Sequence, residues 1–371
     1  MKIALLVPAM DIGGVEQGTF DLACGFQKLG HQVLVISGPG RFIPRLQEKG
    51  IRWYPVPMER KNPFNFYRVL VKVKRVFAEE KPDIIHSRSR FPAWVAKFAV
   101  GSCAGHLITS IHGFHHNRWY SRIMARGERV IVISEGLKDY AIRFLGADKE
   151  KIRVVYNGFD FKPFLTPTLP SPSRGRNKDE MVREFTVGAV GRLTAVQGFR
   201  YLLKAIVMLS PDFPELKVIL IGSGPEETAL KNLAAELGLK QKISFLKGQA
   251  ADYLSSFNLM VVPNLTPEPR PENGPFWSRR TGAEAQVAGV PVVTTMSGLA
   301  AGTFEIGETN IFTAPCDPLG LSRAIKYAVT HPTEIRELAE KAKKTALEHF
   351  SLDRMVNRTL SVYQELLSQN T

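Results

Sequence analysis

One stretch decides the fold: KIALLVP (residues 2–8), a short loop through Asp11, and then GGVEQGTFDLA (residues 13–23). The apolar run predicts a buried strand, the paired Gly13-Gly14 predicts a tight turn, and the residues after it predict a helix. The free N–H groups and the positive end of the helix dipole would point at one spot, where missing side chains let a phosphate approach. A tight βα turn without any ligand explains the same residues, so the stretch alone leaves both interpretations open.

Short apolar strands alternate with helical patterns through the first half of the chain. This alternation predicts a mostly parallel sheet covered by helices on both faces. The expected strands are Ile3–Val7, Gln32–Ile36, Asp83–His86, Leu107–Ile111, Arg129–Ile133 and Arg153–Tyr156.

The alternation restarts after a segment rich in Pro, Ser and charged residues, which predicts a linker. We therefore expect four parts: a first α/β domain over 1–165, a linker over 166–183, a second α/β domain over 184–345, and a helix in 346–371 that could return to the first domain. A ligand is expected in the cleft between the domains, at the carboxyl ends of the strands. The expected strands of the second domain are Phe185–Val190, Lys217–Ile221, Lys242–Leu246, Asn258–Val262 and Pro291–Thr295.

Charge is distributed unevenly along the 371 residues, whose net formal charge is +14. Residues 1–165 hold 26 Lys and Arg against 14 Asp and Glu, whereas the remainder is nearly balanced. A basic surface of this kind attracts anionic lipid, nucleic acid or a phosphorylated substrate.

The sequence also indicates a compartment. We find no apolar run of the roughly 18 residues that a membrane span needs, and no signal-peptide pattern. The three cysteines, Cys24, Cys103 and Cys316, are scattered and lack the spacing of a metal site or a disulfide framework. We therefore expect a cytoplasmic protein without a bound metal.

Three motifs of the second half place ligand-binding groups at the ends of predicted strands. Arg192 follows a strand and Gly191, and its guanidinium suits phosphate oxygens. Gly222-Ser223-Gly224 follows the next strand and lets a ligand approach the backbone. Glu284, near the start of a helix, has a carboxylate that can accept hydrogen bonds from a ribose diol. A carboxylate that only stabilises the helix dipole explains Glu284 equally well.

Taken in order, the motifs resemble the retaining GT-B glycosyltransferases of family 4, over nearly the whole chain. Residues 87–94 (SRSRFPAW) and 124–134 (MARGERVIVIS) resemble a bacterial subgroup involved in surface polysaccharides and lipopolysaccharide. The motifs that carry the family resemblance are Gly13-Gly14-Val15-Glu16, Leu29-Gly30-His31-Gln32-Val33, Asp83-Ile84-Ile85-His86, Ile111-His112-Gly113, Asn157-Gly158-Phe159-Asp160, Gly191-Arg192-Leu193, Gly222-Ser223-Gly224-Pro225 and residues 284–293 (EAQVAGVPVV).

The resemblance implies two Rossmann-like domains and the transfer of a sugar from a nucleotide-sugar, bound mainly by the second domain, to a glycan acceptor bound by the first. It implies that Gly13 and Gly14 face the donor diphosphate, that Arg192 clamps it, and that Glu284 binds the ribose. His112 would contact the transferred sugar near the reacting centre. Stabilising the charge that develops on the leaving nucleoside diphosphate lowers the barrier, and family members do so without a metal.

The chain departs from the family pattern at three donor-site positions. Gln197 stands where a lysine is usual, Phe276 where a carboxylate is usual, and Ala300-Ala301 near the place of another acid. Glu272 is a candidate replacement for the missing acid. Arg279 and Arg280 are candidate replacements for the missing lysine. Two readings follow: an active transferase with a rearranged donor pocket, or a catalytically degenerate relative that binds nucleotide-sugar or acts as a scaffold.

Two basic helical stretches bear on the acceptor. Arg68, Lys72 and Arg75 fall on one helical face, and residues 117–126 interleave Arg118 and Arg122 with Trp119 and Tyr120. Cationic faces with aromatic residues suit the surface of an anionic membrane, although ordinary solvated helices explain each stretch alone. With the excess of positive charge in the first half, these stretches favour a lipid-linked or phosphorylated acceptor and peripheral contact with the inner face of the cell membrane. We expect no nucleic-acid binding, because no binding module is present.

Overall fold

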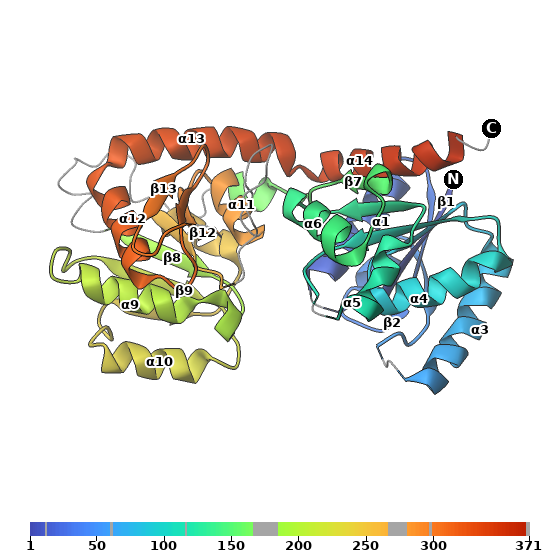
Figure 1. Ribbon diagram of the computed structural model, residues 1–371, viewed down its shortest axis with the longest axis horizontal. Coiled ribbons are helices and arrows are strands. Elements are labelled where there is room, and N and C mark those ends of the chain that lie inside the picture. Colours follow the sequence, from blue (N-terminus) through green and yellow to red (C-terminus); the bar gives the residue numbers. More distant parts are fainter. Residues whose placement is uncertain are drawn as a thin grey trace. The chain divides into compact units, whose positions relative to one another are not determined.

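The computed structural model describes residues 1–11, 13–59, 62–115, 117–165, 185–265, 280–296 and 299–368. The chain divides into two compact units: unit 1 is Met1–Phe159 with Phe350–Thr371, and unit 2 is Asp160–His349. Each unit consists of a sheet with helices packed on it (Figure 1). The expected linker, 166–183, lies outside the described residues.

In unit 1, the described residues form a parallel sheet of seven strands in the order β3-β2-β1-β4-β5-β6-β7. The interior of β1 is fully buried, because helices cover both faces of the sheet. The strands are β1 (Lys2–Ala9), β2 (Gln32–Gly38), β3 (Arg52–Pro55), β4 (Ile84–Ser87), β5 (His106–Ile111), β6 (Arg129–Val132) and β7 (Ile152–Val154).

The longer helices of unit 1 bury one apolar face each. In α3, Val69, Val73 and Val76 are buried, whereas Arg68 and Lys72 are exposed, as the sequence pattern predicts. The helices are α1 (Gly14–Lys28), α2 (Ile43–Glu48), α3 (Pro63–Glu80), α4 (Arg90–Ala99), α5 (Arg118–Ser121), α6 (Glu135–Tyr140) and α14 (Leu352–Leu367).

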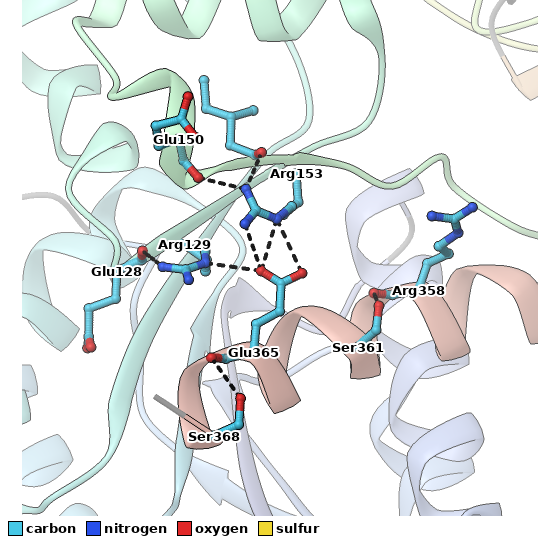
Figure 2. Close-up of polar contacts among 9 residues, drawn as sticks. Glu128, Arg129, Glu150, Arg153, Arg358, Ser361, Glu365 and Ser368 are labelled. Carbon is cyan, nitrogen blue, oxygen red and sulfur yellow. Dashed lines mark hydrogen bonds and ion pairs between the residues drawn. The ribbon is translucent and has the colours of Figure 1, made fainter. Parts of the chain in front are cut away.

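The last helix, α14, packs on α1 within unit 1. The rings of Tyr363 and Phe26 lie 5.3 Å apart, and both side chains are fully buried. Glu365 on the same helix accepts charge-assisted hydrogen bonds from Arg153 on β7 and Arg129 on β6, at 3.0 and 3.3 Å (Figure 2). Burial opposes ionisation of this carboxyl, but the two arginines hold its pKa below the ordinary value.

In unit 2, the described residues form a second sheet of seven strands, ordered β10-β9-β8-β11-β12-β14-β13. The sheet is parallel except at its edge, where β13 runs antiparallel to β14. The strands are β8 (Thr186–Val190), β9 (Lys217–Ile221), β10 (Ile243–Leu246), β11 (Leu259–Val262), β12 (Val292–Thr295), β13 (Phe304–Ile306) and β14 (Ile311–Thr313). The helices are α7 (Lys162–Leu165), α9 (Phe199–Leu209), α10 (Glu227–Glu236), α11 (Arg280–Val287), α12 (Pro318–Thr330) and α13 (Pro332–His349).

The predicted α/β architecture of two Rossmann-like units with parallel sheets is confirmed, and three strands were not predicted. The strand β3 has only four residues and lies half-exposed at the sheet edge, so it carries no apolar run. The strands β13 and β14 have three residues each and no large apolar residue extends them, whereas the equally short β7 is followed by Val155 and Tyr156. Among the helices that the structure describes, none is long and apolar enough to cross a lipid bilayer.

Candidate functional site

The strand order of each sheet reverses at one point, and ligands of open α/β sheets bind beyond the carboxyl ends of the strands there. In unit 1 the reversal lies between β1 and β4. Gly13-Gly14 follows β1, Arg88 follows β4, and His112 follows the neighbouring β5. In unit 2 the reversal lies between β8 and β11, which are followed by Gly191-Arg192 and by Asn264.

The turn before α1 leaves the start of that helix without a side-chain cap. Gly13 is the N-cap residue and its carbonyl accepts the first helical hydrogen bond, from Gln17 N at 2.9 Å. The carboxylate of Glu16 folds back so closely that a β-carbon on Gly13 would overlap it. A β-carbon on Gly14 would meet nothing within 4 Å. The turn is therefore open at Gly14, and the amide groups of the first helical turn are available to an anion.

His112 lies at the carboxyl end of β5 and is half-buried. Its Nε2 is shielded from solvent and has no hydrogen-bond partner among the described residues. Burial, reinforced by the positive charge of Arg88, holds the pKa of His112 well below its usual value. The imidazole is therefore neutral near pH 7, with one ring nitrogen free for a ligand.

Backbone hydrogen bonds hold the loop after β8 against the loop after β9. Gly191 N donates to Ile221 O, and Leu193 N donates to Ser223 O, each at 3.0 Å. Gly222 has a φ of +149°, and a β-carbon there would overlap the carbonyl oxygen of Gly191. Only glycine permits this close approach. The two loops thus form a fixed edge that carries Arg192, which is exposed and makes no ion pair with any described residue.

Gln197 ends a short 3₁₀ turn, Ala195–Gln197, and its side chain lies over the same loop. Its Oε1 is 3.4 Å from the position that a β-carbon on Gly191 would take. The next residue, Gly198, has a φ of +74°, and a β-carbon there would overlap the carbonyl oxygen of Pro263. The position expected to carry a lysine is therefore held beside Gly191-Arg192, but it is occupied by an uncharged amide.

Glu284 lies in the second turn of α11 and is only 7% exposed. Burial raises the pKa of this carboxyl, and a hydrogen bond from Arg280 opposes that rise. Arg280 Nε donates to Glu284 Oε1 at 2.8 Å, so the two predicted site residues form an ion pair within one helix. Because α11 connects two parallel neighbouring strands, β11 and β12, it begins at the carboxyl edge of the sheet.

Two buried polar groups at these edges were not assigned a role from the sequence. Arg88 in unit 1 is 4% exposed, and Asn264 in unit 2 has a buried Oδ1 without a partner among the described residues. Like Arg192, each lies within two residues of the end of a strand, which is the signal that could have found them.

Three candidate residues, Glu272, Phe276 and Arg279, lie outside the described residues. Within the described residues, no group of three or more His, Cys, Asp or Glu side chains is placed to hold a metal ion.

Two family models match the chain, one on each unit. The model described as "Glycosyltransferase Family 4" matches residues 12–162, and the model described as "Glycosyl transferases group 1" matches residues 175–347. The chain is 25% identical to the uncharacterized glycosyltransferase MJ1607 of Methanocaldococcus jannaschii, over 98% of both chains. It is 24% identical to the D-inositol 3-phosphate glycosyltransferase of Streptomyces coelicolor, a match that spans 66% of this chain and 56% of that relative.

Solved structures share the fold of the chain. Anabaena Alr3699/HepE in complex with UDP superposes with a TM-score of 0.81, at 22% identity over 98% of this chain and 100% of that one. The lipopolysaccharide outer core galactosyltransferase WaaB superposes with a TM-score of 0.73, at 16% identity over 98% and 99%. Both units are therefore accounted for by the same class of enzyme, and the chain belongs to the family 4 glycosyltransferases of the GT-B fold.

Proposed function

We propose that the protein transfers a sugar from a nucleotide-sugar donor to a glycan acceptor, with retention of the anomeric configuration and without a metal. The main support for the proposal comes from unit 2, where Arg192 is exposed on the loop after β8. Close packing of Gly222 against Gly191 holds that loop in place. The leaving group of such a reaction is a nucleoside diphosphate. A preorganised cation at its oxygens stabilises the charge that develops in the transition state.

Each candidate residue of unit 2 has a role in this proposal. Arg192 and Gln197 bind the diphosphate, and the backbone at Gly222 and Gly224 lets the nucleotide approach the sheet edge. Glu284 accepts hydrogen bonds from the ribose hydroxyls. Its pairing with Arg280 favours the ionised form of the buried carboxylate, because the pair offsets part of the cost of burial.

The candidate residues of unit 1 act on the diphosphate and on the sugar. The open turn at Gly13 and Gly14 presents amide groups to the diphosphate. His112 is neutral, and its free Nε2 either donates or accepts a hydrogen bond at the transferred sugar. Positive charge for the leaving group comes from arginine and helix dipoles, so the proposal requires no metal.

A surface of unit 1 supports a lipid-linked acceptor and peripheral membrane contact. Trp119 is 75% exposed and stacks on Trp94, which in turn stacks on the exposed Phe98. Phe64 and Tyr67 of the neighbouring α3 are 73% and 69% exposed. The exposed cations Arg68, Lys72, Lys97 and Arg118 stand on the same elements. We call these residues the aromatic–basic face, which suits the anionic inner surface of a membrane. WaaB, whose name refers to the lipopolysaccharide outer core, agrees with such an acceptor.

A transfer assay tests the proposed reaction. The full-length protein is incubated with a panel of labelled nucleotide-sugars, with and without a bacterial membrane extract as acceptor, and chelator is added in parallel. We expect slow hydrolysis of one donor, transfer of its sugar to the extract in the presence of chelator, and a product with the anomeric configuration of the donor. Binding without turnover would support the degenerate reading instead, and inversion or chelator sensitivity would contradict the mechanism.

A flotation assay tests the membrane contact. We expect the protein to float with vesicles containing phosphatidylglycerol, to stay behind with pure phosphatidylcholine, and to be released by salt. Replacing both Trp119 and Phe64 with Ser should weaken binding about tenfold or more, because two exposed aromatic rings no longer insert. The matched control replaces two exposed apolar residues of unit 2, Val196 and Met208, with Ser. Equal loss in both variants, or equally strong binding to DNA, would contradict the assignment.

A further inference from the structure

Arg88 is a buried arginine whose side chain forms no ion pair with any residue in the described ranges. It follows β4 directly, and its backbone N–H donates to Leu6 O of β1 at 3.0 Å. The side chain is 4% exposed, and both Nε and Nη2 are buried without a hydrogen-bond partner among the described residues. Burial lowers the pKa of this guanidinium to about 10, so it still carries its charge at neutral pH.

An arrangement of this kind reduces stability unless something binds to it. Removing a guanidinium from water without a partner costs several kcal/mol, and a buried donor that stays unsatisfied adds to that cost. The two unpartnered nitrogens form the side edge of the guanidinium, whose parallel N–H groups match the two oxygens of a carboxylate or a phosphate.

The surroundings of Arg88 also favour an anion. Its Nη2 lies 3.1 Å from the position that a β-carbon on Gly18 would take, so it faces the second turn of α1. That helix is fifteen residues long, and its positive end has no side-chain cap. The charge of Arg88 also lowers the pKa of His112, whose Nε2 is the other buried nitrogen of this edge without a partner among the described residues.

The acidic groups nearby are engaged elsewhere. Asp21 accepts a hydrogen bond from Gln17 Nε2 at 2.8 Å, and Glu16 folds back on Gly13. The hydroxyl of Tyr363, which also lies close enough to influence Arg88, pairs with His86 Nδ1 at 2.6 Å. Among the residues that the structure describes, none forms a hydrogen bond with the side edge of the guanidinium, which can therefore accept a group from outside the chain.

We infer that Arg88 is an oxyanion-binding residue, which holds a phosphate or carboxylate group of a substrate at the reversal point of the first sheet, beside the start of α1 and the Nε2 of His112. The site needs no sugar transfer to operate, so it can be tested without a donor. The oxyanion belongs either to the donor diphosphate or to an acid or phosphate group on the acceptor.

Thermal unfolding with inorganic phosphate tests the site, with chloride at matched ionic strength as reference. Phosphate should raise the Tm of the full-length protein by about 2–4 °C, as mass action requires of a ligand that binds only the folded state. Arg88→Met should lose this rise and, without phosphate, unfold at a Tm equal to or above that of the wild type, because an unpaired buried charge has been removed. Arg88→Lys keeps the positive charge but lacks the two parallel N–H groups of the guanidinium, and should weaken phosphate binding about fivefold or more.

The control variant is Arg358→Gln, which removes one exposed positive charge of α14 (Figure 2). It should keep the full phosphate response. The inference is overturned if phosphate stabilises Arg88→Met as much as the wild type, or if Arg88→Met lowers the Tm and phosphate stabilises neither protein, since Arg88 would then be structural. If Arg88→Met does not fold, an unchanged phosphate affinity in Arg88→Lys overturns it.

The source of the oxyanion follows from nucleotide binding by the same variants. If the group is the donor diphosphate, Arg88→Met and Arg88→Lys weaken binding of UDP or the preferred nucleoside diphosphate about tenfold, in parallel with phosphate. If it belongs to the acceptor, nucleotide affinity stays within about twofold of the wild type while phosphate binding is lost. The phosphate-binding and nucleotide-binding results can be interpreted even if the transfer assay fails, because neither measurement requires a reaction.

Discussion

Arg280 donates a hydrogen bond to Glu284 across one turn of α11, at 2.8 Å, and so stabilises the charge of a carboxylate that is 7% exposed. Both residues were candidates for the donor site, Glu284 as the ribose ligand and Arg280 as a substitute for the missing lysine. Within α11 the arginine pairs with the carboxylate. The ionisation of Glu284 therefore depends on Arg280, and this dependence can be measured.

Arg280→Gln should shift the acid limb of nucleotide binding to higher pH. Burial raises the pKa of Glu284 and Arg280 opposes the rise, so removing Arg280 raises that pKa further. The carboxylate then becomes protonated at a pH where the wild type still binds. Titrating nucleotide affinity between pH 4.5 and 8 gives the shift. Lys231→Gln, which removes an exposed ion pair of the same spacing on α10, should leave the limb in place. If the nucleotide affinity of the wild type and of Arg280→Gln falls at the same pH, the ionisation of Glu284 does not depend on Arg280.

Gln197→Lys should tighten binding of the donor diphosphate roughly tenfold, or ~1.4 kcal/mol. The side chain at 197 lies over Gly191, next to Arg192, and a lysine there would supply a second cation. The affinity is measured by calorimetry with the nucleoside diphosphate. Val196→Lys adds the same charge at a neighbouring, half-exposed position and should change the affinity little. Equal affinities for all three proteins would mean that the diphosphate does not lie at this loop.

The stability of the protein should fall as the pH drops from 6.5 to 5. Burial holds the pKa of His86 and of His112 well below the usual value, so the folded protein leaves both unprotonated while the unfolded chain protonates them below about pH 6.5. For each pH unit below about 6.5, each histidine therefore lowers the free energy of unfolding by up to about 1.4 kcal/mol. Carboxylates with lowered pKa, such as Glu365, act only at lower pH.

Denaturant unfolding at pH 5, 5.5, 6 and 6.5 measures that slope. His86→Gln should flatten it, whatever its effect on absolute stability, because one of the differences in proton binding between the folded and unfolded protein disappears. A slope identical to that of the wild type would show that His86 does not stay neutral in the folded protein.

Glu365→Gln should lower the free energy of unfolding by about 1 kcal/mol at pH 7, since α14 loses its ion pairs with Arg153 and Arg129 at a partly exposed site (Figure 2). The difference between the two proteins should vanish as the pH falls through the lowered pKa of Glu365. Glu79→Gln breaks an exposed pair with Arg75 and serves as the comparison. An equal effect of the two substitutions would show that Glu365 is an ordinary surface charge.

The sequence predicted much of the fold because eleven strands carry apolar runs bounded by turns. It missed β3, β13 and β14, which are short strands at or next to a sheet edge, defined by their pairing partners rather than by their own residues. Each of these strands exists because a neighbouring strand offers it hydrogen bonds, and that information is not local.

The candidate site was predictable where a motif follows a strand, as at Gly13, Gly191 and Gly222. The spacing of four residues suggests that Arg280 pairs with Glu284. It does not reveal that the Glu284 carboxylate is buried, which is why its ionisation depends on Arg280. The sequence motif that contains Arg88 does not indicate its role, because only the packed structure reveals that its guanidinium is buried without a partner for Nε and Nη2 among the described residues.

The central claim is that unit 2 binds a nucleotide-sugar through Arg192 and Glu284. The most direct measurement is calorimetric titration of the wild type, Glu284→Ala and Arg192→Ala with a panel of nucleotide-sugars. We expect saturable binding of at least one of them by the wild type, weakened roughly tenfold or more in each variant because each loses a charge-assisted hydrogen bond. Wild-type protein that binds none of the panel, or variants that bind as tightly as the wild type, would contradict it.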